Sequence, residues 1–342
     1  MAEQNIELLL VTKPEDKYYL SGFESSNFYI VLTQNRDYLL TDFRYLEAAR
    51  KKIFGFEIIK IDASYSIFDF LAKYDKMNIG IEENHLTAED YKVLEKSFTS
   101  EKILFAQNIF NNQRMIKDEY EIRCIQHAAE IADYAFTQLL GDIAPGVSEK
   151  ELALKLEEIM KREGASQLSF ETIVASGERS SLPHGVATDK IIQKGDFITL
   201  DYGCIVDHYC SDMTRTVAVG KVSEDMKTVY EIVQAAQKKS LEKIAPGFIA
   251  SDIDEIARKK IKDAGYGEFF GHGLGHGVGL EIHEAPRLSP TSHVELLEGM
   301  VVTVEPGIYL PNNFGVRIED LVVITDNGIN NLSLFTKELI IV

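Results

Sequence analysis

Basic residues and cysteines are scarce in this sequence, and long apolar runs are missing. The 342 residues include 36 Lys and Arg against 54 Asp and Glu, a formal net charge of −18. Nucleic acids and anionic membranes attract basic patches, so this balance argues against either as a partner. Three cysteines (Cys124, Cys204 and Cys210) fit a reducing cytoplasm. Without a run of 18 apolar residues or a basic N-terminal region, we expect neither a transmembrane helix nor a signal peptide.

The length and the 45% hydrophobic content predict two packed domains. Residues 1–113 alternate short strand and helix patterns, which is typical of a small α/β domain. The expected strands are Ile6–Thr12, Phe28–Leu32, Tyr38–Thr41, Asn78–Glu82 and Lys102–Ala106, and the expected helices are Arg44–Ile53 and Ala88–Ser97. A long helical stretch then runs from near Met115 to about Leu140. We therefore predict domains at 1–113 and 114–342.

The second domain contains a degenerate internal repeat. Residues 144–146 (Ala-Pro-Gly) recur 101 positions later as residues 245–247, and Gly164 recurs as Gly265 at the same shift. The amphipathic patterns of Glu149–Arg162 and Asp252–Lys262 lie between these matches. Residues 195–203 likewise parallel residues 299–307. The repeat predicts two halves around a pseudo-twofold axis, each with two helices and a hairpin.

Four acidic residues face one another in pairs across the two predicted hairpins. Strands Phe197–Ile205 and His208–Val219, joined at Val206-Asp207, set Asp201 opposite Asp212. Strands Met300–Leu310 and Phe314–Ile324, joined at residues 311–313, set Glu305 opposite Glu319. Two carboxylates at ~5 Å repel each other by ~3 kcal/mol at an effective dielectric near 20. Two such pairs predict a cation between them, and a dinuclear metal site is the natural candidate.

Residues 271–284 are rich in glycine and hold three of the chain's eight histidines. Alternate glycines argue against a helix, because each costs ~1 kcal/mol relative to alanine. We expect an extended strand in which His272 and His276 share one face. The glycines would let the backbone approach a ligand closely. His283 would lie on the opposite face unless a bulge intervenes.

These motifs together resemble the signature blocks of the metallopeptidase family that contains prolidase and aminopeptidase P. The matching blocks are Asp201 with residues 212–216, residues 271–284, residues 303–307 and residues 316–320, with weaker matches at 19–23 and 42–45. The resemblance covers essentially the whole chain. It implies an α+β architecture in which a smaller α/β creatinase/prolidase-type N-terminal domain precedes a C-terminal pita-bread fold with an internal pseudo-twofold repeat. It also implies a homodimer.

The resemblance implies that five residues bind two divalent metal ions per subunit. These are Asp201, Asp212, His276, Glu305 and Glu319. Asp212 and Glu319 would bridge the ions, Asp201 would complete one shell, and His276 with Glu305 would complete the other. Oxygen donors with one imidazole suit Mn²⁺ or Co²⁺ and accept Zn²⁺ or Fe²⁺, with Mn²⁺ favoured.

Further roles follow from the same resemblance. Glu305 matches the family's proton shuttle. His184 and His283 match histidines that contact the substrate and the developing oxyanion. His272 is assigned to substrate binding.

Two arginines leave alternatives open. Arg317 could orient carboxylates, either those around the metal site or that of the substrate. Alternatively, it pairs with nearby acids such as Asp320. Arg287 matches a position where prolidases carry an arginine for the substrate carboxylate, which would exclude longer peptides. As a solvated loop residue, Arg287 would have no such role.

The resemblance implies hydrolysis of the peptide bond before proline, in a small peptide with proline in second position. Arg287 favours Xaa-Pro dipeptides, the prolidase reaction; an aminopeptidase P would act on longer peptides. Methionine aminopeptidases share the five ligands without a separate N-terminal domain, and creatinase-like amidinohydrolases work without metal. Two more distant alternatives remain, a non-enzymatic peptide-binding relative and a two-metal phosphohydrolase outside the family.

Overall fold

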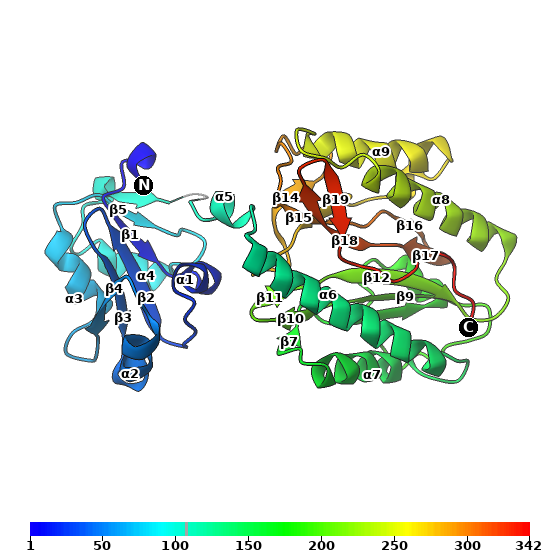
Figure 1. Cartoon of the computed structure of the whole chain (residues 1–342), viewed down its shortest axis with the longest axis horizontal. Helices are drawn as coiled ribbons and strands as arrows, with labels where there is room; N and C mark the ends of the chain where they lie inside the picture. The colour runs from blue at the N-terminus through cyan, green and yellow to red at the C-terminus, as the bar shows by residue number, and fades with distance from the viewer. Residues whose placement is uncertain (107–108) are drawn as a thin grey trace. The chain divides into compact units, whose positions relative to one another are not determined.

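The computed structural model describes residues 1–106 and 109–342. These residues form two compact units, Met1–Gln113 and Arg114–Val342 (Figure 1). The short helix α5 (Asn111–Arg114) lies at the division between them in the sequence.

The first unit is built on a mixed six-stranded sheet of order β4-β3-β2-β1-β5-β6. Its strands are β1 (Leu8–Val11), β2 (Phe28–Thr33), β3 (Asp37–Thr41), β4 (Phe56–Lys60), β5 (Ile79–Ile81) and β6 (Ile103–Phe105). Its helices are α1 (Pro14–Ser21), α2 (Phe43–Lys52), α3 (Ile67–Leu71) and α4 (Ala88–Leu94). The strands and helices predicted here are confirmed, whereas α1, α3 and β4 were not anticipated.

Helices cover both faces of this sheet. Strand β1 is buried along its whole length. Leu8 and Leu10 pack into a core with residues of α3 and α4, whereas Leu9 and Val11 pack on the other side with α2. Since successive side chains of a strand point to opposite faces, a fully apolar strand requires cover on both.

The second unit contains four long helices and several short strands. The helices are α6 (Glu119–Leu139), α7 (Glu149–Arg162), α8 (Glu224–Leu241) and α9 (Ala250–Asp263). The strands of its first half are β7 (Gln167–Leu168), β8 (Ile173–Ser176), β9 (Phe197–Tyr202), β10 (Cys204–Val206), β11 (Tyr209–Cys210) and β12 (Met213–Ala218). Those of its second half are β13 (Gly275–Gly277), β14 (Glu284–Leu288), β15 (Val301–Val304), β16 (Gly307–Leu310), β17 (Phe314–Arg317), β18 (Asp320–Thr325) and β19 (Gly328–Asn331).

The predicted repeat is visible in the order and packing of these elements. Helices α6 and α7 pack with β8, β9 and β12 in one core, and α8 and α9 pack with β15 and β18 in another. The matched glycines adopt matched conformations: φ is 113° at Gly164 after α7 and 91° at Gly265 after α9. Left-handed glycine at this position is a common helix end, so the repeat is preserved in the backbone.

Each predicted long strand is interrupted near its acidic residue. In the first hairpin, Asp201 pairs with Thr214 and not with Asp212. The turn is Asp207-His208, with φ of 46° and 72°, one position later than predicted. Both central residues of this tight turn need positive φ, which Asp and His adopt more readily than the β-branched Val206. The predicted direct pairing of Asp201 with Asp212 was wrong by two positions, but a shift of two leaves both on the same face.

The second hairpin has the predicted register. Val304 pairs with Asp320 in β15 and β18, and Gly307 pairs with Arg317 in β16 and β17. Glu305 and Glu319 lie in the gap between these two pairings. The break in the ladder at Pro306 frees both carboxylate-bearing residues from regular strand geometry, because proline has no N–H to donate.

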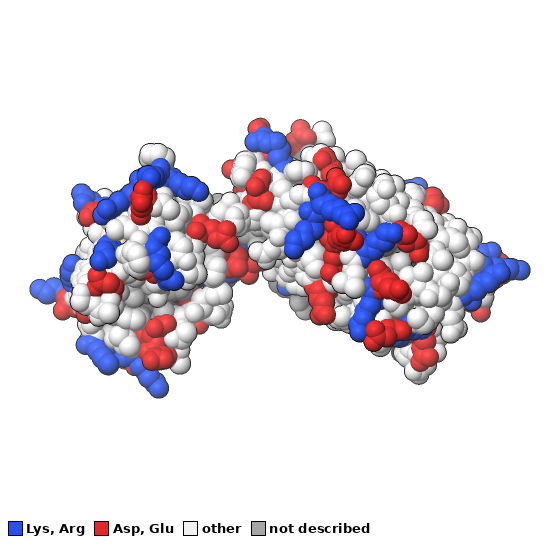
Figure 2. Space-filling view, turned by 90° about the horizontal axis from the view of Figure 1, so that it is seen from below, with Lys and Arg blue, Asp and Glu red and all other residues white. Residues whose placement is uncertain are grey.

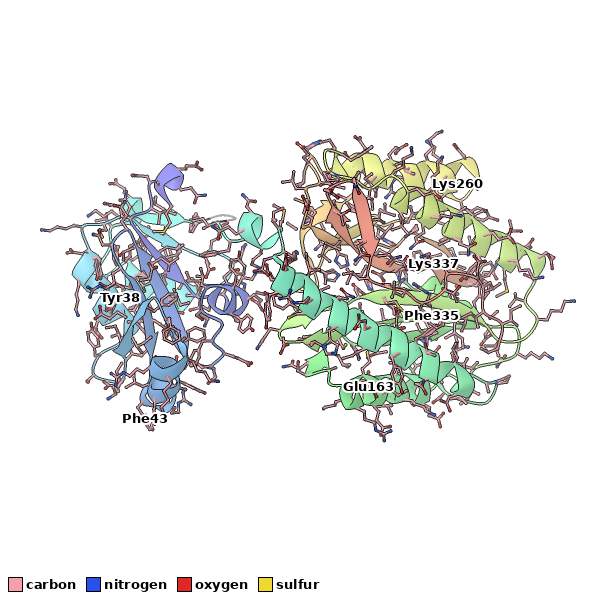
Figure 3. The ribbon with its side chains drawn as sticks, viewed as in Figure 1. Tyr38, Phe43, Glu163, Lys260, Phe335 and Lys337 are labelled. Carbon is pink, nitrogen blue, oxygen red and sulfur yellow. The ribbon has the colours of Figure 1, made fainter. Side chains whose placement is uncertain are left out.

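The C-terminal segment closes the second unit. Phe335 and Lys337, labelled in Figure 3, join it to the helices and the sheet. The Phe335 ring packs edge-on against Phe136 of α6 at 4.8 Å, and Lys337 Nζ lies 2.6 Å from Asp320 Oδ2. Within each unit, Lys and Arg lie among Asp and Glu on the face drawn in Figure 2. Among the described residues, no helix has the length and apolar character needed to span a membrane.

Candidate metal centre

One cavity of about 1010 Å³ brings together every residue that the sequence predicted for the site. It is lined by the proposed ligands Asp201, Asp212, His276, Glu305 and Glu319, and by His184, His272, His283, Arg287 and Arg317. All of them lie within the second unit.

The centre of the cluster is a set of three buried side chains. Asp212, His276 and Glu319 each offer one ligand atom, and these atoms all lie within 4.8 Å of one another. His276 Nε2 is 3.5 Å from Asp212 Oδ2 and 3.3 Å from Glu305 Oε1. One imidazole nitrogen therefore faces two carboxylates that come from the two halves of the repeat.

Local bonds fix the orientation of the His276 ring. Its Nδ1 lies 3.1 Å from Gly277 O, and a carbonyl oxygen can only accept, so Nδ1 carries the proton. Nε2 then has a free lone pair toward the carboxylates, as metal-binding histidines require. Burial first, and then His283, lower the pKa of His276 to about 3, which keeps the ring neutral.

The glycines of β13 allow close strand packing, and Gly275 also lines the cavity. A β-carbon on Gly275 would lie 2.0 Å from Thr303 O, and one on Gly277 would lie 2.2 Å from Ala285 O. The expected strand is also shorter than predicted, because β13 begins at Gly275. These glycines therefore press His276 into the sheet, next to β14 and β15.

A chain of hydrogen bonds connects Asp201 to Glu319. Arg317 donates from Nη2 to Asp201 Oδ2 at 2.6 Å and from Nε to Thr214 Oγ1 at 3.1 Å. Thr214 in turn donates to Glu319 Oε2 at 2.6 Å. Arg317 therefore pairs with a nearby acid, Asp201, whereas Asp320, the acid named as an example, pairs with Arg215 and Lys337. Arg317 orients a carboxylate of the cluster.

His272 is held by Tyr309, a residue that the sequence analysis did not single out. An arginine only donates, so Arg317 Nη1 donates to Tyr309 Oη at 2.8 Å. The tyrosine hydroxyl then donates to His272 Nε2 at 3.0 Å, and His272 Nδ1 donates to Gly273 O at 2.8 Å. Both ring nitrogens of His272 thus have hydrogen-bond partners, and the residue lines the cavity.

The carboxylates of the cluster are buried close together. Burial, followed by Glu319, raises the pKa of Asp212 well above its ordinary value; burial, followed by Glu305, does the same for Glu319. Burial raises the pKa of Glu305 to about 8, with Arg317 opposing the rise. Asp201 Oδ1 and Glu319 Oε1 are buried without a hydrogen-bond partner among the described residues. Unpaired buried oxygens of this kind are what a bound cation would satisfy.

A bulge brings His283 to the site. The pairing of β13 with β14 shifts between His276 and Gly277, so that Gly277 pairs with Glu284 and His276 pairs with Arg287. The His283 ring packs against the His276 ring at 4.4 Å. The bulge therefore overrides simple alternation, which would place His283 on the opposite face.

His184 and Arg287 line the cavity. Both are exposed, and Arg287 lies in strand β14 and not in a loop. Neither is held by a hydrogen bond comparable to those around Arg317 among the described residues. Their place at the wall of the cavity suits contact with a bound molecule.

Three supporting residues were missed by the sequence analysis, although the sequence carried a signal for them. Thr303 accepts from His276 N at 3.1 Å and donates to Glu305 Oε1 at 3.2 Å. Thr214 and Tyr309 hold Glu319 and His272, as described above. Thr214 and Thr303 lie two positions from a proposed ligand, and Tyr309 lies four from Glu305. Alternation along a strand predicts that such positions share the ligand's face.

Comparisons with known proteins agree on the family. Residues 123–326 match metallopeptidase family M24, and residues 1–116 match the creatinase/prolidase N-terminal domain. An Xaa-Pro dipeptidase of Pyrococcus furiosus is 41% identical over 343 residues, covering 99% of this chain and 97% of that protein. The structure of an Xaa-Pro dipeptidase from Bacillus anthracis matches with TM-score 0.96 and 42% identity, covering 100% of this chain and 96% of that one. An X-Pro aminopeptidase from Thermotoga maritima MSB8 matches with TM-score 0.91 and 38% identity, covering 100% and 99%.

The predicted architecture, a creatinase/prolidase-type domain followed by a pita-bread domain, is confirmed by these matches. Membership of a metallopeptidase family also implies divalent metal ions, and the cluster of Asp212, His276 and Glu319 offers a place for them. The chain belongs to metallopeptidase family M24.

Proposed function

We propose that this protein is a two-metal peptidase that hydrolyses Xaa-Pro dipeptides. The observation that carries the proposal is the single cavity in which four carboxylates, one neutral imidazole and the exposed Arg287 meet. The names of the relatives support cleavage of the Xaa-Pro bond. Two are named Xaa-Pro dipeptidases, at 41% and 42% identity, and one is named an X-Pro aminopeptidase, at 38%. Aminopeptidase action on longer peptides is the second candidate.

The residues of the cluster fit two metal ions. Asp212 and Glu319 lie at its centre, and the ions would be held by these two carboxylates together with Asp201, His276 and Glu305. The unpartnered oxygens Asp201 Oδ1 and Glu319 Oε1 support this assignment. Four ionised carboxylates balance the formal charge of two dications. The oxygen-rich donor set favours Mn²⁺, with Co²⁺, Zn²⁺ and Fe²⁺ as alternatives.

When bound, two divalent ions would polarise the scissile carbonyl and lower the pKa of a water molecule toward neutrality. The protein's own residues would supply positioning and proton transfer. Glu305 would carry a proton from the attacking water to the leaving nitrogen of proline, which needs one because it leaves as an amine. His283, packed on His276, and His184, on the cavity wall, would donate hydrogen bonds to the substrate and to the developing oxyanion. Arg317 would hold Asp201 in place.

Arg287 supports a dipeptide substrate. Its register partner is His276, so its guanidinium lies at the cavity wall beside the proposed metal site. A guanidinium fits a planar carboxylate in a bidentate manner, which a dipeptide offers directly after its proline. A longer peptide has an amide at that place and would leave the guanidinium unpaired. We therefore expect Arg287→Ala to raise KM for Xaa-Pro dipeptides; unchanged hydrolysis would contradict this role.

We also propose a domain boundary, a location in the cell and an oligomeric state. We assign residues 1–113 to the N-terminal domain and residues 114–342 to the catalytic domain. The thiols of Cys124, Cys204 and Cys210 are free and buried, which supports a cytoplasmic location. We propose a homodimer from family resemblance, and light scattering of the purified protein would test it.

Product analysis tests the proposed function. Protein loaded with Mn²⁺ is given Ala-Pro or Ala-Pro-Ala, with a chelator-treated sample as control. We expect chelator-sensitive cleavage of Ala-Pro alone. Release of alanine from the tripeptide would identify an aminopeptidase. Failure to cleave either peptide, with metal bound, would indicate a peptide-binding protein.

A further inference from the structure

A buried ionic cluster lies behind the loop that carries His283. The segment before α6 supplies two cations, Arg114 and Lys117, of which the Lys117 side chain is 0% exposed. Lys117 Nζ lies 2.6 Å from Glu284 Oε1, and Arg114 Nη2 lies 2.6 Å from Glu284 Oε2. Each oxygen of Glu284 thus has its own cation, which fixes both the position and the rotation of the carboxylate.

Arg114 holds the loop at a second point as well. Arg114 Nη2 also lies 2.9 Å from Glu281 Oε2. Glu281 lies in the loop between β13 and β14, and Glu284 lies at its end. Ion pairs therefore hold the loop on either side of His283.

Lys117 is itself anchored to the framework that carries the proposed ligands. Its backbone N–H donates to Gly299 O at 2.9 Å, and Ile116 forms a bridge with Met300 directly before β15. Strand β15 leads to Glu305. The ionic cluster thus connects the loop that carries His283 to the strand that leads to Glu305.

Gly279 shows how closely the loop fits this cluster. A β-carbon there would lie 2.5 Å from Glu284 Oε1. Such a contact is ordinarily relieved by a movement of the flexible glutamate, but Lys117 and Arg114 hold this one. Gly279 O also accepts from Cys210 N at 2.8 Å, which fixes the other side of the loop.

We propose that Lys117 and Arg114 are positioning residues that act through Glu284 to hold the His283 ring against His276. The bulge at Gly277 brings the loop to the site, and the two cations keep it there. Burying charges in this way is costly unless they are paired, so a purely structural anchor would be better served by apolar residues. This inference rests on the proposed function, because it assumes that His283 takes part in hydrolysis.

The test is a double-mutant cycle between Lys117→Met and His283→Ala, with kcat and KM measured on Ala-Pro. We expect Lys117→Met to lower kcat roughly 10–100-fold, with KM and metal content little changed, as for other residues that orient site groups. In the His283→Ala background, Lys117→Met should lower kcat no further. Equal losses in both backgrounds would overturn the proposal, because Lys117 would then act independently of His283.

A second variant covers the case in which Lys117→Met does not fold. Gly279→Ala removes no charged group but forces the loop backbone and the held Glu284 carboxylate apart, so it should lower kcat in the same His283-dependent way. Gly328→Ala, where an added β-carbon meets nothing within 4 Å, is the matched control and should be silent. Full activity of Gly279→Ala would overturn the positioning role. Full activity of His283→Ala would overturn the proposed role of His283 as well, which separates the two failures.

Discussion

The two halves of the pita-bread domain share a backbone plan but contribute different groups to the site. The first half supplies two aspartates, Asp201 and Asp212, whereas the second supplies Glu305, Glu319 and the imidazole of His276. Each half also holds a proposed ligand of the other: Arg317 of the second binds Asp201, and Thr214 of the first binds Glu319.

This exchange explains how a repeated framework can form one asymmetric site. Asp201 and Glu319 are each held by a residue of the other half, so the centre is complete only when both halves are packed together. His276 and Glu305 are the exception, because Thr303 of their own half supports both. The comparison suggests that the two sides of the site respond differently to substitution.

The largest difference should follow from removing one ligand in each half. We expect Glu305→Ala to abolish turnover, because it removes both a ligand and the proposed proton carrier. Asp201→Ala should also inactivate the enzyme but leave His276 and Glu305 to bind one ion. Metal analysis after dialysis would distinguish the variants, and full turnover by Glu305→Ala would refute the scheme.

Removing the metal should destabilise the second unit, because the clustered carboxylates then repel one another without compensation. Binding at 100 times Kd adds about 2.7 kcal/mol, which corresponds to a rise in Tm of several degrees for a domain of this size. Calorimetry with and without chelator measures this shift. The first unit provides the internal control, since its transition should not respond to the metal.

The exchange of support between halves should be visible in metal affinity. Arg317→Met leaves Asp201 without its charged partner and should weaken binding roughly 10–100-fold. Thr214→Val removes a neutral donor to Glu319 and should weaken it less, since bonds from charged groups are the stronger. Calorimetric titration of both variants compares them, and an equal effect would argue against an electrostatic role for Arg317.

Each half contains a glycine packed closely against a neighbouring backbone, and both positions should be similarly intolerant of a larger residue. A β-carbon on Gly203 would lie 2.0 Å from Ser211 O, the same distance as that from Gly275 to Thr303 O. Alanine at either position should cost at least 1–3 kcal/mol, roughly the effect of overpacking. Urea denaturation provides the measurement. A silent Gly275→Ala would show that β13 does not need the close approach.

The smallest expected difference concerns the helices. Ser148 caps α7 in a reciprocal arrangement with Glu151, whereas the residue at the same place before α9, Ile249, makes no side-chain cap. Ser148→Ala should lower the free energy of unfolding by ~1 kcal/mol. The loss should appear as a lower denaturation midpoint at unchanged activity.

The sequence predicted the framework better than the details of the site. The sequence predicted the repeat of Gly164 at Gly265 and the register around Glu305 and Glu319. Glycines at helix ends and alternation along strands are local signals. The strand partner of Asp201 could not be predicted, because moving the turn by one residue, to Asp207-His208, changes which residues pair across the hairpin. The bulge that brings His283 to His276 was left open, because strand alternation does not indicate where a pairing shifts.

Support from distant residues was the hardest part to predict. Lys117 and Glu284 are far apart in the sequence, and nothing in either local pattern indicates that they meet. Tyr309 likewise reads as an ordinary strand residue until Arg317 is placed beside it. Such contacts arise from tertiary packing, which alternation and spacing do not encode.

The most direct test of the account is the number of metal ions that the two halves bind together. Equilibrium dialysis of the metal-free protein against Mn²⁺, followed by electron paramagnetic resonance, would count the ions and report whether they interact. We predict two ions per chain with the spectrum of a spin-coupled pair. A single ion, or two magnetically isolated ions, would contradict a shared centre built from both halves.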